Sequence, residues 1–183
     1  MQEPRMKEKY KKEILPHLME KWNLKSPFQA PRLEKIVVSV GAGQAISNPA
    51  FLEEVLENLF YITGQKPVKT LARKSVAGFK VRKGMSVGAK VTLRKDKMYE
   101  FFDRLVSIVL PRLRDFQGIK PSFDKEGNLS IGIKEHTVFP EINLDKVKNI
   151  HGLQITFVTN TKNKEMAKDL LEMLGFPFKK EAK

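Results

Sequence analysis

The chain of 183 residues contains no cysteine. This absence excludes a disulfide-stabilised scaffold, catalysis by a thiolate and zinc sites built from cysteine. The sequence also lacks any apolar run near the roughly 20 residues that a transmembrane helix needs, which argues against an integral membrane protein. Residues 1–12 mix glutamate with lysine and have no apolar stretch. We therefore expect no secretory signal, no membrane partner and a cytoplasmic location.

Acidic residues are missing from the segment 65–95, although it contains ten lysines and arginines. The whole chain has a formal charge of +13, so this segment carries about three quarters of the excess. Such a patch attracts nucleic-acid phosphates by counterion release, and its binding weakens steeply with salt. A solvated surface is the alternative, but solubility gives no reason to exclude every acidic side chain from the segment. The pattern favours a polyanionic partner.

Apolar and polar residues alternate in several segments, and this two-residue period predicts β-strands with one buried face. The expected strands are 33–40, 67–71, 86–94, 129–134 and 153–159. We predict a single α+β domain over residues 1–183, with a mostly antiparallel sheet and helices that cover one face. Residues 1–25 form its N-terminal helical segment, and residues 72–85 form a long basic hairpin loop.

A longer apolar period predicts the helices. The expected ranges are 6–22 with an interruption at Pro16, 49–63, 96–111 and 163–174. Asn48, which precedes a proline, and Asp96 are the expected N-caps of the second and third helices. Gly64 is the expected end of the second helix.

The uncovered face of the sheet follows from the same alternation. Its side chains are small, hydrogen-bonding or cationic, and none is acidic: Ser39, Lys90, Thr92, Arg94, Ser130, Gly132, Lys134, Gln154 and Thr156. Hydroxyls, amides and cations of this kind suit the 2′-hydroxyls and phosphates of structured RNA. The face lacks the paired aromatic residues on which single-strand readers stack bases. An ordinary hydrated sheet face remains the alternative.

Catalytic motifs are incomplete. Residues 84–88 match the pattern G-x-S-x-G, but a strand follows Ser86 where a hydrolase elbow requires a helix. The three histidines, His17, His136 and His151, are scattered and form no triad pattern. We expect no enzyme, no metal, no cofactor and no small-molecule substrate. A hydrolase acting through Ser86 is kept as a rival reading.

Five strings resemble a known family in order and over nearly the whole chain. They are RLEKIVVSVGAG at 32–43, GQKPVKTLARKSVAGFKVRKGMSVGAKVTLR at 64–94, LPRLRDFQGI at 110–119, SFDKEGNLSIGIKEHTVFPEI at 122–142 and LLEMLGFPF at 170–178. The family is that of bacterial large-subunit ribosomal protein number five, which carries 5S rRNA.

The resemblance implies a five-stranded antiparallel sheet related in topology to the RRM, whose open concave face binds 5S rRNA in the central protuberance. It also implies that the basic hairpin reaches P-site tRNA and that another edge bridges to a protein of the small-subunit head. Neighbouring 5S-associated proteins of the large subunit are further implied partners, as is a location on the cytoplasmic ribosome. A free RNA chaperone or nonspecific binder of structured RNA is the alternative.

The resemblance assigns roles to individual residues. Gln65 and Thr92 match family positions that hydrogen-bond 5S rRNA, and Ser39 stands where the family normally has asparagine. The full set expected to contact 5S rRNA is Ser39, Gln65, Lys90, Thr92, Arg94, Ser130 and Lys134. The set expected to contact tRNA is Arg73, Lys74, Ser75, Lys80, Arg82 and Lys83. Phe79 in the same loop either packs within the loop, which we favour, or stacks on a base.

Overall fold

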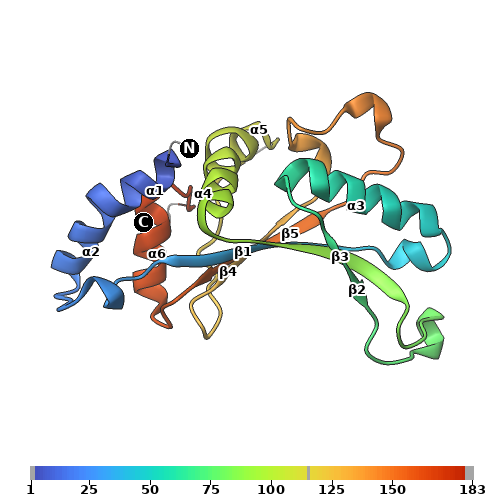
Figure 1. The fold of residues 1–183 in the computed structure, drawn as a ribbon, viewed down its shortest axis with the longest axis horizontal. Helices are drawn as coiled ribbons and strands as arrows, with labels where there is room; N and C mark the ends of the chain where they lie inside the picture. The colour runs from blue at the N-terminus through green and yellow to red at the C-terminus, as the bar shows by residue number, and fades with distance from the viewer. Residues whose placement is uncertain (1–2, 115, 180–183) are drawn as a thin grey trace. The chain divides into compact units, whose positions relative to one another are not determined.

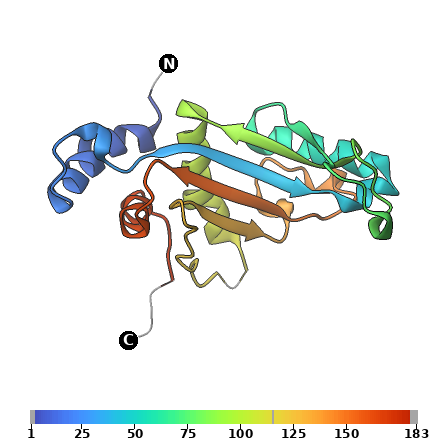
Figure 2. The ribbon, with the colours of Figure 1, turned by 90° about the horizontal axis from the view of Figure 1, so that it is seen from below.

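The computed structural model describes residues 3–114 and 116–179, and its strands form one five-stranded sheet in the order β2-β3-β1-β5-β4 (Figures 1 and 2). The strands are β1 (Leu33–Gly41), β2 (Val68–Leu71), β3 (Ser86–Leu93), β4 (Leu129–Ile133) and β5 (Leu153–Thr159). β2 and β3 pair antiparallel. Backbone hydrogen bonds near the ends of the other pairs, such as Ala42 N to Val87 O at 2.9 Å and His136 N to His151 O at 3.0 Å, show the same direction. The predicted α+β class with an antiparallel sheet is confirmed.

The helices occupy the four segments that the apolar period predicts. They are α1 (Arg5–Lys9), α2 (Leu15–Lys21), α3 (Pro49–Thr63), α4 (Lys95–Arg104), α5 (Leu110–Arg112) and α6 (Lys164–Met173). Within the described ranges, no helix is both long and apolar enough to cross a membrane.

A π-helical turn precedes the proline in each of the two interrupted helices. Residues 10–14 form this turn ahead of Pro16, and residues 105–109 form it ahead of Pro111. A proline has no N–H to bond the carbonyl four residues earlier, and its ring crowds that carbonyl. The wider π turn accommodates the ring, and the helix continues instead of ending.

The two predicted N-caps differ from the structure. Asn48 holds the N-cap position of α3, but its side chain makes no capping hydrogen bond. Pro49 and the short turn at 43–46 that precedes it start this helix instead. Asp96 lies in the first turn of α4, whose N-cap position is Arg94, and its carboxylate pairs with Lys7 at 2.7 Å. Gly64 ends α3 with a left-handed φ of 62°, as predicted.

The chain packs as two compact units, each with its own core. The first consists of Met1–Ile36, Arg94–Ile131 and Thr156–Lys183. Phe157 of β5 lies at its centre, edge-on to Phe102 of α4 at 5.7 Å between ring centroids and to Phe176 at 5.3 Å. Trp22 donates its indole N–H to Asp169 of α6 at 3.1 Å, which ties the end of the N-terminal helical segment to this core.

The second unit consists of Val37–Leu93 and Gly132–Ile155. Its core joins one face of β1 and β3 to α3, and Val38, Val91, Val55 and Leu59 are all buried there. Figures 1 and 2 both show α3 along one side of β3. Burial of each such side chain contributes about 1.5–3 kcal/mol, so this contact fixes which face of β3 is left for solvent.

Gly88 lies where β3 comes unusually close to its neighbour. A Cβ added to this glycine would meet the Val40 carbonyl oxygen at 2.5 Å and the Thr70 hydroxyl at 2.9 Å. Since the first obstacle is backbone, the strands must separate to admit any side chain. A Cβ added to Gly132 on β4, in contrast, would have no atom within 4 Å.

Gly88→Ala is expected to destabilise the protein by about 1–3 kcal/mol, because the methyl group forces β1 and β3 apart. Gly132→Ala is the matched control and should leave stability unchanged or slightly higher, since alanine costs less backbone entropy than glycine. Denaturant unfolding of both variants measures the difference. Equal stability of the two variants would contradict the close approach at Gly88.

A stacked histidine pair is buried in the second unit. The rings of His136 and His151 are parallel, with centroids 4.0 Å apart. Asn58 of α3 places its amide nitrogen 3.3 Å from Nε2 of His136 and 3.2 Å from Nε2 of His151. Donation from this amide to both Nε2 atoms fits two neutral rings. Burial, with the neighbouring His136 adding to it, lowers the pKa of His151 to about 4, and burial also lowers the pKa of His136.

Stability is expected to be constant above about pH 6.5 and to fall as the pH drops toward 4. Between pH 6.5 and pH 4, His151 becomes protonated in the unfolded chain but stays neutral in the folded protein. The free energy of unfolding therefore decreases by an amount on the order of 3 kcal/mol by pH 4. Denaturant unfolding across this range measures the loss, and NMR of the imidazole signals should show His151 still neutral at pH 5. His17→Gln is the control, because His17 is exposed. Titration of His151 near pH 6.5 would refute the account.

Candidate RNA interface

The face of the second unit opposite α3 carries the polar side chains of β1 and β3. Ser39 and Thr92 are half-buried, whereas Lys90 is exposed. Their strand neighbours Val38 and Val91 are buried beneath α3, so the alternation turns these three side chains to the other face. Lys134, which follows β4, is also exposed. The expected separation into a covered apolar face and an open polar face is therefore present.

Gln65 lies beside Thr92 because of the way α3 ends. Gly64 reverses the chain, and the Thr63 hydroxyl donates to the Leu59 carbonyl at 2.6 Å and accepts from Gln65 N at 3.4 Å. The Gln65 side chain then donates from Nε2 to the Thr92 carbonyl at 3.1 Å. This bond uses one amide hydrogen and holds the amide in place, while no described residue occupies its oxygen. Two residues predicted separately thus form one contact, and Thr63, which sequence reasoning missed, positions them.

The other two predicted sheet residues, Arg94 and Ser130, belong to the first unit. Ser130 of β4 is exposed, and its hydroxyl lies 2.9 Å from the Thr156 hydroxyl of β5. Arg94 is exposed at the residue before α4, where the backbone is extended. This unit therefore presents a hydroxyl pair and a guanidinium to solvent.

The basic loop at 72–85 is a hairpin extension of β2 and β3 (Figure 1). Ala72 N donates to Met85 O at 2.8 Å, and an isolated bridge joins Val76 to Val81. The Ser75 hydroxyl accepts from Lys83 N at 3.0 Å, so this predicted RNA contact also stabilises the loop itself.

All five cations predicted in this loop are exposed: Arg73, Lys74, Lys80, Arg82 and Lys83. Within the described part of the chain, none of them is in a salt bridge. Their charge is therefore available to an external polyanion.

Phe79 does not pack within the loop, and that prediction is wrong. Its side chain is 76% exposed and lies at the end of the short 3-10 turn Ala77–Phe79. Its neighbours within the turn, Ala77 and Gly78, are small and cover little of the ring.

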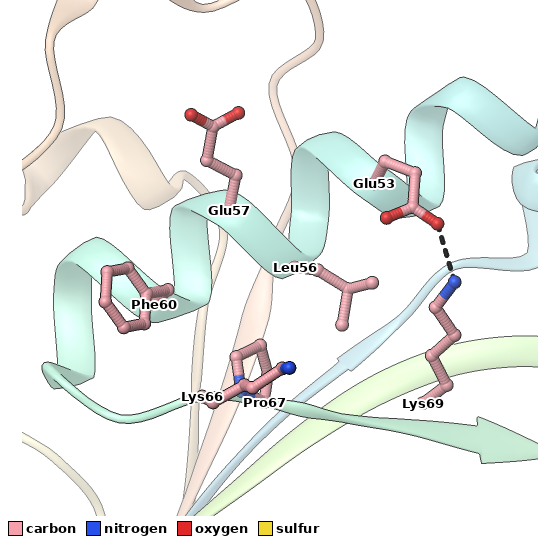
Figure 3. Close-up of a pocket in the computed structure, with 7 residues that line it drawn as sticks. All are labelled: Glu53, Leu56, Glu57, Phe60, Lys66, Pro67 and Lys69. Atoms are coloured by element: carbon pink, nitrogen blue, oxygen red, sulfur yellow. Dashed lines mark hydrogen bonds and ion pairs between the residues drawn. The ribbon is translucent and has the colours of Figure 1, made fainter.

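A groove of about 580 Å³ lies between α3 and the start of β2 (Figure 3). It is lined by Glu53, Leu56, Glu57, Phe60, Lys66, Pro67 and Lys69. Glu53 pairs with Lys69 at 2.6 Å, so one cation of the basic segment is neutralised by a carboxylate from α3. With charges of both signs and several apolar side chains, the groove does not share the composition of the open face.

The pattern around Ser86 does not form a hydrolase elbow. Ser86 is the first residue of β3 and pairs with Leu71 of β2, so the chain continues as a strand. Among the described residues, no group of three or more histidine, aspartate or glutamate side chains gathers to hold a metal.

An α+β protein with a polar, cation-bearing sheet face and a basic hairpin loop is of a nucleic-acid-binding class. A family model described as ribosomal protein L5 matches residues 26–82, and a second model, for the C-terminus of the same ribosomal family, matches residues 86–178. The large ribosomal subunit protein uL5 of Carboxydothermus hydrogenoformans is 51% identical over 176 residues, which cover 96% of this chain and 98% of that protein. The chain belongs to the ribosomal protein L5 family.

Members of this family are structural, rRNA-binding proteins of the ribosome and not enzymes, so the hydrolase reading is wrong. In bacteria the ribosome is cytoplasmic, which agrees with the expected location.

Proposed function

We propose that this chain binds 5S rRNA through the open face of its sheet and helps to attach that RNA in the central protuberance of the large subunit. The observation that carries the proposal is the hydrogen bond from the Gln65 amide to the Thr92 carbonyl, which fixes this amide beside the strand residue whose hydroxyl belongs to the open face. An RNA backbone offers 2′-hydroxyls that both donate and accept, and such a pair of groups can bind them.

Exposed cations in each of the two units supply attraction that does not depend on RNA sequence. Lys90 and Lys134 in the second unit and Arg94 in the first are exposed and suited to phosphates. Neutral polar groups then determine which RNA groups lie opposite the protein. They are Gln65, Thr92 and Ser39 in the second unit and Ser130 in the first. Affinity and selectivity are thereby divided between two kinds of side chain.

The hairpin loop at 72–85 forms a second contact, which we assign to P-site tRNA. The loop extends beyond β2 and β3 (Figure 1), and the five cations that it carries are exposed. A further edge of the protein bridges to a protein of the small-subunit head in this proposal, and neighbouring 5S-associated proteins complete its surroundings.

Ser39 is the weak point of the proposed 5S contact. A serine hydroxyl donates one hydrogen, whereas the asparagine usual in the family donates two and reaches further. Loss of one hydrogen bond to RNA, or its replacement by a bridging water, costs about 1 kcal/mol.

The first experiment measures binding of the purified protein to 5S rRNA, a tRNA and a hairpin RNA of matched length over a series of salt concentrations. We expect a preference for 5S rRNA that survives moderate salt, because the neutral contacts of the sheet face do not depend on counterions. Ser39→Asn should tighten 5S binding about fivefold and leave the matched hairpin unaffected. Equal affinities for the three RNAs that fall together with salt would leave only a nonspecific RNA binder.

Charge reversal in the loop tests the second contact. The triple variant R73E/K74E/R82E is expected to bind tRNA at least tenfold more weakly and 5S rRNA with nearly unchanged affinity, because the loop lies outside the proposed 5S surface. The control variant K120E/K125E/K164E has the same net charge, and its altered residues are exposed and distant in sequence from the loop. Loss of 5S binding in the loop variant comparable to that of a Thr92→Val variant would contradict the division of roles.

A further inference from the structure

Phe79 is an exposed aromatic side chain with no packing role in the fold. It is 76% exposed, whereas Phe51, Phe101, Phe102 and Phe157 are all buried. Exposure of a phenyl ring is unfavourable in water. The exposed surface of the Phe79 ring is therefore available to an external ligand.

The backbone holds Phe79 at the end of a defined turn. Phe79 N donates to Val76 O at 3.3 Å, Lys80 N donates to Ala77 O at 3.0 Å, and Lys80 takes a left-handed φ of 55° that reverses the chain. The Val76–Val81 bridge closes the turn from both sides. A ring on a preformed turn loses little conformational freedom on binding, which favours its use as a contact.

The surroundings of Phe79 select an RNA ligand over an apolar one. The ring is followed directly by Lys80, with Arg82 and Lys83 just beyond it, and the segment 65–95 contains no acidic residue. Lysine is depleted from the centres of protein interfaces, whereas cations beside an aromatic ring are usual where single-stranded nucleic acid binds.

The tip also leaves room for a flat ring system. Gly78 has nothing within 4 Å of the position where a Cβ would lie, and Ala77 is small. A base that approaches Phe79 therefore meets no side chain at the neighbouring position 78.

We propose that Phe79 stacks on an unpaired base of the RNA that the 72–85 loop contacts, and so makes the loop selective for RNA with accessible bases over fully paired RNA. The proposal rests on the proposed RNA contact of the loop. It adds to that contact a contribution to the binding free energy that does not depend on charge. Bases inside a duplex are already stacked on each other, so only an unpaired or terminal base can offer its face to the ring.

The test compares Phe79→Ala, Phe79→Leu and Phe79→Trp in binding to a tRNA and to an RNA duplex with the same number of phosphates, whose two ends are closed by non-nucleotide linkers so that no terminal base is accessible. Phe79→Ala and Phe79→Leu are expected to weaken tRNA binding about fivefold or more, with an unchanged salt slope, and to leave the duplex unaffected. Phe79→Trp should bind tRNA as well as the unmodified protein, because tryptophan restores the stacking surface. Phe28→Ala is the matched control, since Phe28 is 82% exposed and lies outside the loop.

A spectroscopic readout separates stacking from a merely structural role. The chain has one tryptophan, Trp22, so the fluorescence added by Phe79→Trp reports on the loop tip. Stacking predicts quenching of this added signal by tRNA and little quenching by the duplex.

Three outcomes would overturn the proposal. Full affinity of Phe79→Leu would indicate an apolar contact, equal weakening for tRNA and duplex would indicate damage to the loop, and unchanged binding by Phe79→Ala would exclude any contact. If Phe79→Ala binds tRNA normally, the variant R73E/K74E/R82E distinguishes failure of the stacking proposal from failure of the proposed tRNA contact. If it loses tRNA binding while Phe79→Ala does not, the stacking proposal fails and the proposed function stands. If neither variant affects tRNA, the proposed tRNA role of the loop fails as well.

Discussion

The two-residue period of the β-strand is the constraint on which the proposed function depends. In β1, Val38 and Val40 are buried, so Ser39 between them must point to the opposite side. In β3, Val91 and Leu93 are buried and enclose Thr92 in the same way. A slip of one residue in either strand would bury the polar groups and expose the valines. Hydrophobic burial therefore enforces the polar face as strictly as it builds the core.

The loop at 72–85 can carry its charge because it takes no part in that core. Desolvation would make an unpaired cation costly inside the protein, but the loop cations stay in water. Lys69 shows the contrast, since it lies in β2 beside α3 and is paired with Glu53. Charge is thus neutralised where the segment meets a helix and left free where it extends beyond the sheet.

The sequence predicted those parts of the structure that depend on short-range pattern. Strand and helix ranges agree within a few residues, because burial periodicity is local, and Gly64 was found because a left-handed end favours glycine. Asn48 and Asp96 failed as caps, since a residue type suited to a cap does not determine its rotamer or partner. Phe79 failed because packing needs a neighbour, and the sequence did not show that the turn offers none.

Contacts between segments that are distant along the chain could not be predicted from the sequence, for a different reason. The Gln65–Thr92 bond, the stacked His136 and His151 and the close approach at Gly88 each join positions whose spacing along the chain carries no signal. Scattered histidines in particular gave no hint of a pair. Such features follow from the sheet order and the docking of α3, which are fixed by the whole fold.

β3 links the two proposed RNA contacts physically. Its second half carries Lys90 and Thr92, and its first residue, Ser86, borders the hairpin loop. Between them the pairing with β2 shifts register, because Thr70 faces Gly88 whereas Leu71 faces Ser86. An extra residue on one strand bends the pair and increases its twist, so this irregularity sets the direction in which the loop leaves the sheet. Gly88 lies at the bend, where only a residue without a side chain fits against Val40. The angle between the polar face and the loop is therefore built into the strand that carries both.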